Sequence, residues 1–486
     1  MEILITNNIQ VTDPDNKFLQ WLTDNYTIRN PEYDKRVKLN LWIGNTPKTL
    51  PLYSKHNTSN VYKIPYGCIR EVLKFIRDNY PSDEVPIYVE LNEGETADWE
   101  GTSPTLRDYQ EDCVQTMLKK KFGIIKAPCS AGKTIMGHEL AKRTGMKTLW
   151  ITHTKDLLYQ SMQVGISMVG EENVGTITNG KINIGKVITY ATVQTLDKMD
   201  RKDLGKLFNC VIVDECHRCN SKTKITQMSR AINSIKAEYK YGLSATPETF
   251  DGYFRSILCN LGNIEYEIEE EELIATNRIM NVQIVPIFTE WNYPDAAYRS
   301  DGTLDFNKAV HLMAEDEKRN DIIISLLNGK PTLILSDTIE MLVNIMNRLS
   351  VEDAKRACLI STRHNEDAIK GNGKYVVRKH DSTSRLRYLQ QLSTGELDYM
   401  FATYSLAKEG LNVPRFEQVI LCFPAVSPNI ITQSIGRVAR KAEGKELAVC
   451  YDLVDKPSYF HRLYKDRLKL YKKANKNVID LKQWGL

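Results

Sequence analysis

The segment APCSAGKT, residues 127–134, has the residue types and the spacing that bind the phosphates of a nucleotide. It follows the predicted strand 123–126 and precedes the amphipathic stretch 135–142, which predicts a loop between a strand and a helix. Backbone N–H groups in such a loop point toward a phosphate at the positive end of the helix. The residues expected to form this cradle are Cys129, Ser130, Ala131 and Gly132.

The end of the same loop supplies the reactive side chains. The Lys133 ammonium would reach the β- and γ-phosphates, and the Thr134 hydroxyl would hold Mg²⁺. Ala127 stands where a glycine is usual, so most of the specificity lies in the Gly-Lys-Thr ending between a strand and a helix. The loop therefore predicts nucleotide binding.

The stretch VIVDECHRC, residues 211–219, delivers two carboxylates directly after a short apolar run. Asp214 would hold Mg²⁺ through water, and Glu215 would orient and deprotonate the water that attacks the nucleotide. Together with the phosphate loop, this pair predicts hydrolysis of a nucleoside triphosphate.

A metal or redox site is the competing interpretation, because Cys216, His217 and Cys219 carry side chains that bind metals. A structural zinc site needs four ligands, and the nearest other cysteines, Cys210 and Cys259, form no second pair. We therefore favour the magnesium and water site over a zinc or iron–sulfur site.

The elements that must position these residues alternate along the chain from about residue 120. Short apolar runs separated by helix-like stretches indicate parallel sheets covered on both faces, and two such sets predict two α/β domains. The expected strands are 123–125, 148–151, 187–190, 210–213 and 242–243 in the first set, and 332–335, 358–360, 399–402, 419–421 and 447–451 in the second.

The first hundred residues have the pattern of a small α+β module. Alternating apolar residues over 37–43 predict a half-buried strand, and the segments 69–76 and 86–91 predict a helix and a further strand. Trp42 would lie on the polar face of the first strand, near Lys38. It either stacks on a base or a duplex end, or packs under the next element.

Further motifs accompany the phosphate loop in a fixed order, and the set resembles the superfamily 2 helicases of the DExH-box group. The matching segments are 106–110, 151–154, 192–195, 214–217, 244–247, 333–337, 403 with 409–414, and 433–440. The resemblance covers residues 105 to 452 and implies two tandem RecA-like domains that use ATP and Mg²⁺.

The resemblance also implies roles for individual residues. Gln110 would contact the adenine, and Gly410 and Asn412 would bind the nucleotide, although many members carry aspartate at the latter position. The residues expected to contact nucleic acid are Thr152, His153, Thr192, Gln194, Ser336 and Thr403. Those expected to couple hydrolysis to movement are His217, Ser244 and Thr246.

Arg437 and Arg440 lie in the second α/β set, whereas Lys133 lies in the first. Three residues apart on a predicted helix, the two arginines would face one side. An arginine finger is worth roughly 10³–10⁵ in rate, and we expect both arginines, with Gln433, to act in catalysis. Hydrolysis would then need the two domains to close, which makes a hinge motor.

Within the superfamily, the Ser-Ala-Gly-Lys loop, the compact length and the small N-terminal module resemble the bacteriophage UvsW-type helicases. This closer resemblance implies a viral protein that unwinds or branch-migrates forked or branched DNA in replication, recombination or repair. An RNA helicase is an alternative, because the motifs do not distinguish the two sugars. A DNA-dependent ATPase clamp or switch that separates no strands is another.

The composition predicts a soluble, cytoplasmic protein, which would lie in the host cytoplasm if the protein is viral, and we expect a monomer. No apolar run approaches the ~20 residues of a membrane span, and ten scattered cysteines suit reduced thiols. A net charge of +4 is too small to imply nucleic-acid binding by itself. Residues 455–486, however, carry nine basic and three acidic residues interleaved with aromatic ones, and they either grip a duplex or pack on the sheet.

We expect three domains. Residues 1–100 would form the nucleic-acid-binding module and residues 101–276 the ATP-binding RecA-like domain. Residues 277–486 would form the second RecA-like domain with the basic C-terminal helix. The acidic run 265–272 near the second boundary is expected to be a solvated face.

Overall fold

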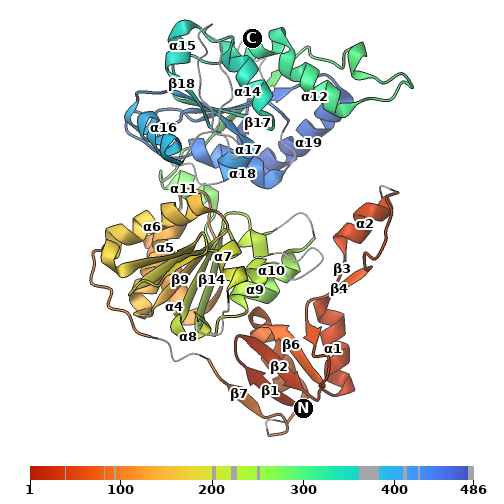
Figure 1. Cartoon of the computed structure of the whole chain (residues 1–486), viewed down its shortest axis with the longest axis vertical. Helices are drawn as coiled ribbons and strands as arrows, with labels where there is room; N and C mark the ends of the chain where they lie inside the picture. Colours follow the sequence, from red (N-terminus) through yellow and green to blue (C-terminus); the bar gives the residue numbers. More distant parts are fainter. Residues whose placement is uncertain are drawn as a thin grey trace. The chain divides into compact units, whose positions relative to one another are not determined.

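The computed structural model describes residues 1–38, 40–81, 83–91, 95–199, 204–219, 227–248, 252–360, 382–408, 413–424 and 427–479. The chain forms two compact units, Met1–Ile268 and Glu269–Leu486 (Figure 1). The division lies somewhat before the boundary expected after residue 276, because helix α11 (Glu270–Ala275) belongs to the second unit.

The larger sheet of the first unit consists of β8 (Phe122–Lys126), β9 (Thr148–Thr152), β10 (Val174–Thr178), β11 (Lys181–Asn183), β12 (Ile188–Thr192), β13 (Cys210–Asp214), β14 (Tyr239–Ser244) and β15 (Ile264–Glu267). Their order is β11-β10-β12-β9-β13-β14-β8-β15, and every pair is parallel except the β10–β11 hairpin. All five strands predicted for the first set are confirmed.

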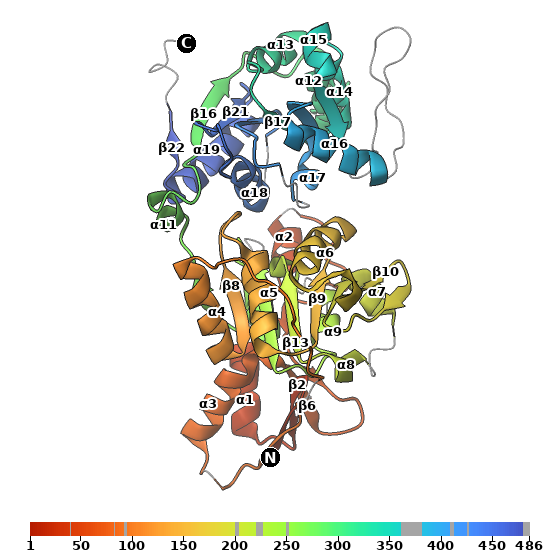
Figure 2. The same cartoon turned by 90° about the vertical axis from the view of Figure 1, so that its left-hand side faces the viewer.

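Helices cover both faces of this sheet (Figure 2). They are α4 (Asp108–Lys120), α5 (Lys133–Thr144), α6 (Lys155–Val169), α7 (Val193–Lys198), α8 (Leu204–Leu207), α9 (Gln227–Ile232) and α10 (Phe254–Leu261). Because of this cover, β9, β12 and β13 are buried along their whole length, as a continuous apolar strand requires.

The N-terminal module has a second sheet made of β1 (Glu2–Ile5), β2 (Asn8–Thr12), β5 (Ser54–Lys55), β6 (Val61–Pro65) and β7 (Ile87–Val89), in the order β5-β6-β2-β1-β7. Its helices are α1 (Asn16–Tyr26) and α3 (Ile69–Asn79), and a short pair of strands, β3 (Thr27–Arg29) and β4 (Thr49–Pro51), extends from it. The helix predicted at 69–76 and the strand predicted at 86–91 are confirmed.

The strand predicted over residues 37–43 is wrong. Helix α2 (Pro31–Lys38) occupies the first part of that segment, and residues 41–43 form no regular element. Asn30 explains the helix, because its side-chain oxygen accepts the Glu32 N–H at 3.1 Å and Pro31 then opens the first turn. The apolar residues face solvent, with Val37 48% and Leu41 53% exposed, so no sheet buries them.

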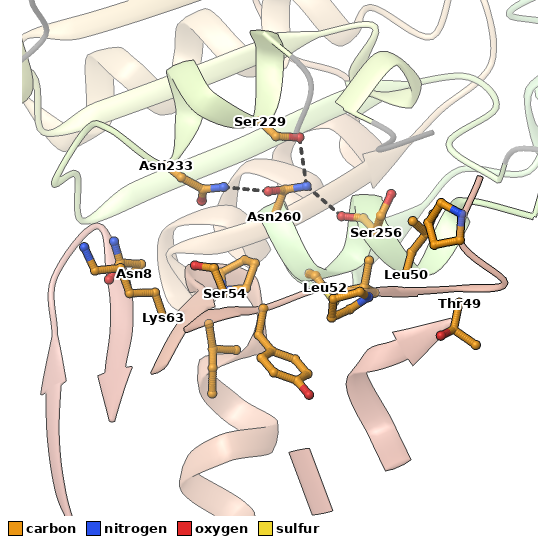
Figure 3. A pocket seen from close by; sticks show the side chains of 16 residues that line it. Asn8, Thr49, Leu50, Leu52, Ser54, Lys63, Ser229, Asn233, Ser256 and Asn260 are labelled. Atoms are coloured by element: carbon orange, nitrogen blue, oxygen red, sulfur yellow. Dashed lines mark hydrogen bonds between the residues drawn. The ribbon is translucent and has the colours of Figure 1, made fainter. Parts of the chain in front are cut away.

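The N-terminal module packs on α10 and on the edge of the larger sheet within the first unit. The Arg255 guanidinium of α10 donates to both oxygens of Glu71, at 3.0 and 2.5 Å, and the Arg70 guanidinium pairs with Glu265. A cavity of about 550 Å³ lies between the module and the helices α9 and α10. Figure 3 shows Leu50 and Leu52 on its module side and a hydrogen-bonded group around Asn260 on the other.

The second unit contains one parallel sheet in the order β18-β19-β17-β20-β21-β16-β22. The strands are β16 (Gln283–Phe288), β17 (Thr332–Ser336), β18 (Ala357–Ile360), β19 (Tyr399–Thr403), β20 (Gln418–Leu421), β21 (Val449–Val454) and β22 (Asn477–Val478). The helices after α11 are α12 (Phe306–Glu315), α13 (Glu317–Ser325), α14 (Ile339–Met346), α15 (Val351–Lys355), α16 (Ser382–Thr394), α17 (Tyr404–Lys408), α18 (Pro428–Val438) and α19 (Ser458–Lys473). All five strands predicted for the second set are confirmed.

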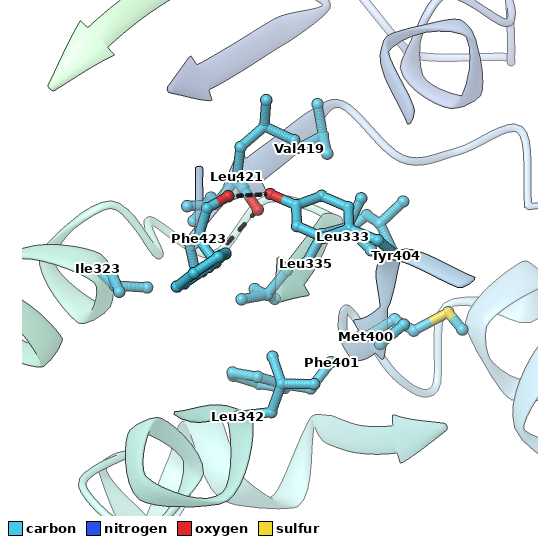
Figure 4. Close-up of a cluster of buried hydrophobic side chains, with 14 of the residues drawn as sticks. Ile323, Leu333, Leu335, Leu342, Met400, Phe401, Tyr404, Val419, Leu421 and Phe423 are labelled. Atoms are coloured by element: carbon cyan, nitrogen blue, oxygen red, sulfur yellow. Dashed lines mark hydrogen bonds between the residues drawn. The ribbon is translucent and has the colours of Figure 1, made fainter. Parts of the chain in front are cut away.

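The core of the second unit forms where β17, β19 and β20 meet the helices above and below them (Figure 4). Leu333, Phe401 and Leu421 are fully or almost fully buried there. The Tyr404 hydroxyl donates to the Phe423 carbonyl at 2.6 Å, so its burial leaves no unsatisfied donor.

The acidic run 265–272 is not a uniformly solvated face, which corrects the prediction. Glu265 is almost buried and pairs with Arg70 and Lys120, because it ends up between the N-terminal module and α4. Glu270 pairs with the buried Lys476 ammonium at 2.7 Å. Among the described residues, no helix is both long and apolar enough to cross a membrane.

Candidate nucleotide and nucleic-acid sites

The phosphate loop lies between β8 and the N-terminus of α5, as predicted. Ser130 and Gly132 have positive φ values of 76° and 86°, which turn the backbone sharply around the loop. The Lys133 ammonium donates to the carbonyls of Ala127 at 3.0 Å and Pro128 at 3.3 Å. It therefore spans the opening that a phosphate would enter.

Gln110 lies directly against this loop. Its side-chain nitrogen donates to the Ala131 carbonyl at 3.0 Å, and its oxygen accepts the Arg107 N–H at 3.0 Å. A Cβ atom added to Gly132 would stand 2.3 Å from the Gln110 amide nitrogen and would displace it, and the φ of 86° already favours glycine at that position. The structure thus brings Gln110 to the phosphate loop, and its contact with adenine stays a prediction.

The two carboxylates follow β13 directly. Asp214 is buried at the strand end, and the Glu215 N–H donates to its carboxylate at 3.0 Å. Burial, and then the neighbouring Glu215 carboxylate, raise the pKa of Asp214, while the Lys133 ammonium opposes this rise. Hard oxygen donors are what Mg²⁺ prefers, so Asp214 and the Thr134 hydroxyl beside Lys133 are suitable ligands.

His217 connects the carboxylates to the next strand. Its Nδ1 atom lies 3.2 Å from the Glu215 carboxylate and 3.2 Å from the Ser244 hydroxyl at the end of β14. The Ser244 hydroxyl also accepts the Thr246 N–H at 3.2 Å. The predicted coupling residues therefore form one continuous set of contacts with Glu215, the carboxylate predicted to act in hydrolysis.

A buried histidine ties the helix of the phosphate loop to the sheet. The His138 ring on α5 contacts the Thr134 carbonyl at 2.7 Å and the Tyr190 hydroxyl of β12 at 2.5 Å, and it stacks on Trp150 of β9. Burial lowers the pKa of His138 to about 4, so its ring is neutral at physiological pH. Thr134 lies one turn earlier on the same helix, whereas Tyr190 and Trp150 come from other elements, so the local sequence gave no signal for those two contacts.

Four residues predicted to contact nucleic acid lie at the ends of β9 and β12. His153, Thr192 and Gln194 line a cavity of about 850 Å³, and the Gln194 amide fixes the wall by donating to the His153 carbonyl at 2.7 Å. Thr152 is fully buried behind this wall, and its hydroxyl donates to the Thr154 carbonyl at 3.0 Å.

The same cavity includes residues that the sequence reasoning missed. The turn of the β10–β11 hairpin, Asn179 and Gly180, forms another part of the wall, and Lys155 and Lys198 add positive charge. An Asn-Gly pair between two apolar runs is a strong hairpin signal, and both residues have the positive φ that such a turn needs. That signal identifies the turn, but only the tertiary fold places it beside Gln194.

In the second unit, Ser336 and Thr403 are register partners at the ends of the parallel strands β17 and β19. Gln433 and Arg437 lie on α18 and are buried. Arg440 is not on the predicted helix, because α18 ends at Val438. Gly410 and Asn412 lie outside the described residues.

Trp42 does not pack under another element of the described chain. Its side chain is 83% exposed, beside the end of α2, and the Arg36 guanidinium donates to its carbonyl at 2.9 Å. The packing interpretation is therefore wrong, and the nucleic-acid interpretation stays a prediction.

Comparison with known proteins gives matches over both α/β domains. The family "Type III restriction enzyme, res subunit" matches residues 103–249, and the family "Helicase conserved C-terminal domain" matches residues 318–442. The DNA 3′-5′ translocase XPB2 of Sulfurisphaera tokodaii is 26% identical over 393 residues, which cover 74% of this chain and 84% of that protein.

Two viral proteins are similar as well. A putative ATP-dependent RNA helicase of Acanthamoeba polyphaga mimivirus is 24% identical, over 77% of this chain and 69% of that protein. The ATP-dependent DNA helicase uvsW of Enterobacteria phage T4 is 23% identical, over 71% of this chain and 68% of that protein. The matches thus include the phosphate loop, the paired carboxylates and the helix with Gln433 and Arg437.

Proposed function

Because the chain belongs to the superfamily 2 helicases and resembles the UvsW type, we propose that it is a DNA motor that unwinds or branch-migrates forked or branched DNA. Its general activity is that of an ATP-dependent helicase acting on nucleic acid. The observation that supports a motor most directly is the His217 contact, which joins the carboxylate of hydrolysis to the end of the neighbouring strand.

Hydrolysis would use the residues around the phosphate loop. Phosphate oxygens would replace the two carbonyls that Lys133 now contacts, and Gln110 would contact the base. Bound Mg²⁺, held by Thr134 and Asp214, would neutralise charge on the phosphates. Glu215 would then take a proton from the attacking water.

Movement would arise along the same edge of the sheet, where the neighbouring parallel strands end. His217 would transmit the state of Glu215 to Ser244 and Thr246. Nucleic acid would lie against the wall of His153, Thr192 and Gln194, where amide and hydroxyl groups bond phosphate and sugar without reading the bases. Sequence-independent contacts of this kind suit a translocating motor.

The second unit would supply the remaining groups. We propose that Arg437 and Arg440, with Gln433, stabilise the charge of the transition state, and that Gly410 and Asn412 contact the nucleotide. Ser336 and Thr403, side by side at strand ends, would also contact nucleic acid. Trp42 would stack on a base or a duplex end.

The test is strand separation on a labelled DNA fork and branch movement in a Holliday junction, each with and without ATP. Product that forms only with ATP supports the motor. ATP consumption without any strand separation or branch movement would show a clamp or switch instead, and the helicase proposal would then be wrong.

RNA is the second candidate substrate, because one relative is named a putative RNA helicase. ATP turnover measured with duplex DNA, single-stranded DNA and RNA distinguishes the two. Stronger stimulation by RNA than by every DNA substrate would overturn the choice of DNA.

A further inference from the structure

Helix α19 is held to the second unit by one buried face. Phe460, Arg467 and Tyr471 are buried on that face. The Arg467 guanidinium donates to Asp452 of β21 at 2.8 Å, and the Tyr471 hydroxyl donates to the same carboxylate at 2.8 Å. These contacts fix which side of the helix faces outward.

The outward side carries a basic stripe, defined as the exposed cations Arg462, Lys465, Lys469, Lys472 and Lys473. At 3.6 residues per turn the five fall within an arc of about 100°, opposite the buried face. Asp466 lies at the edge of the stripe and pairs with Lys469 at 3.2 Å. The other four have no acidic partner in the part of the chain that the structure describes.

Helix stability alone does not explain this stripe. Lys472 and Lys473 in the last turn are favoured by the helix dipole, as cations near a C-terminus usually are. Arg462 and Lys465 lie in the first half, where the dipole favours acids instead, yet the first turn contains no acid. A solvated surface also normally mixes both signs of charge, which this face hardly does.

The length of the stripe suits a nucleic-acid backbone. Arg462 and Lys473 are eleven positions apart, which is about 16 Å along a helix that rises 1.5 Å per residue. Over that distance one strand of B-form DNA carries about five phosphates, one for each cation. Lysine and arginine at such spacing contact phosphate without reading sequence.

We infer that the outer face of α19 binds the phosphate backbone of duplex DNA and adds a contact that none of the helicase motifs provides. The inference rests on the proposed function, since it needs a nucleic-acid substrate. It also explains how a chain with a net charge of only +4 holds a polyanion, because the charge is concentrated on one helix.

The test variant replaces Lys465, Lys469 and Lys472 together by glutamine. Its affinity for a fluorescent DNA duplex is measured at salt concentrations from about 50 to about 200 mM, where the release of counterions changes the affinity strongly. The slope of log K against log salt is negative, and each lost phosphate contact reduces its magnitude by about 0.9. Loss of three contacts should therefore reduce the magnitude of the slope by about 2 to 3. ATP turnover without nucleic acid should stay at the wild-type value.

The matched control replaces Lys308, Lys318 and Lys355, which are exposed on α12, α13 and α15 of the same unit, by glutamine. Because both variants lose three charges, any general effect of net charge appears in both. Equal slopes for the wild type and the α19 variant would overturn the inference and leave the proposed function intact. Absence of duplex binding by the wild type would overturn both.

A negatively charged membrane is the other polyanion that a basic helix can meet. Vesicles containing phosphatidylserine test it with the same variants. Binding of the wild type to vesicles, lost in the α19 variant while duplex binding is unchanged, would overturn the assignment to DNA.

Discussion

At the scale of single residues, Lys133 has the clearest role in the phosphate loop. Its ammonium now contacts only two backbone carbonyls, at 3.0 and 3.3 Å, and it has no acidic partner among the described residues. A positive charge held in this way is available to a phosphate at little cost, because no ion pair has to break first.

Lys133→Ala is therefore expected to abolish ATP turnover and to leave DNA binding mostly intact. Loss of the ammonium would remove the charge proposed to hold the β- and γ-phosphates, whereas the residues proposed to contact nucleic acid line a separate cavity at the ends of β9 and β12. Phosphate release and duplex binding measure the two effects. Lys119→Ala, an exposed lysine of α4, is the control and should keep normal turnover. Wild-type turnover in Lys133→Ala would show that the site is misassigned.

His217→Ala should separate hydrolysis from movement. The ring contacts both Glu215 and Ser244 at 3.2 Å, so its removal breaks the path to β14 but leaves the carboxylates in place. We expect ATP turnover to continue and fork unwinding per ATP to drop at least tenfold, about 1.4 kcal/mol in coupling. Ser244→Ala should behave in the same way. If unwinding and hydrolysis fall in parallel in both variants, His217 acts in hydrolysis rather than in coupling.

At the scale of elements, α19 depends on a buried ion pair. Arg467 and Asp452 are almost completely buried, and the helix meets β21 through them. Arg467→Met leaves Asp452 without its cation, which typically costs about 3–5 kcal/mol. Thermal unfolding should show a fall in Tm of about 6–20 °C, at about 2–4 °C for each kcal/mol in a unit of this size.

The double variant Arg467→Met with Asp452→Leu checks the cause of that loss. Removing both charges should recover part of the stability, because no buried charge then lacks a partner. A double variant that is less stable than Arg467→Met would show that packing around the pair, and not the charge, holds the helix.

Most elements could be predicted because their signals are local. Strands such as β9 and β13 are continuous apolar runs, and the phosphate loop has its own spacing. The strand predicted at 37–43 is wrong because the helix start at Asn30 and Pro31 overrides the period-two alternation, and no sheet buries the segment. The burial of Glu265 could not be predicted, since its partner Arg70 is far away in the chain.

For the candidate site as well, residues with local sequence signals could be predicted, and residues placed by distant contacts could not. Motif residues such as Asp214 and Ser244 lie at strand ends, and parallel strands bring those ends to one edge of the sheet. The contribution of Asn179 to the wall depends on how a hairpin adds to that edge, which no local pattern specifies. Local spacing therefore predicts which residues carry reactive side chains, and the order of strands in the sheet determines which of them lie close together.

At the scale of the whole molecule, the N-terminal module and the larger sheet of the first unit bury a lysine between them. Lys240 of β14 is 1% exposed, and its ammonium lies 4.6 Å from the centre of the Tyr66 ring. The nitrogen has no hydrogen-bond partner within the described residues. Burial lowers the pKa of Lys240 to about 7, well below its ordinary value of 10.5.

This lysine makes stability depend on pH in a definite direction. Between about pH 7 and 10.5 the unfolded chain binds a proton at Lys240 that the folded chain lacks, so the free energy of unfolding rises with pH over that interval. The cost of burying the lysine is fully present below pH 7 and disappears above 10.5. Tyr66 stays neutral across most of the interval, because burial raises its pKa to about 12.

Lys240→Met should therefore stabilise the protein at pH 7, and the gain in Tm should shrink steadily as the pH approaches 10.5. Methionine keeps most of the length of the unbranched side chain beside Tyr66, and it removes the charge. Lys186→Met, an exposed lysine of the same unit, is the control and should leave Tm unchanged at every pH. If the Tm of Lys240→Met at pH 7 is equal to or below that of the wild type, the buried Lys240 ammonium does not destabilise the folded protein. Docking of the module would then depend on Lys240 instead of merely tolerating it.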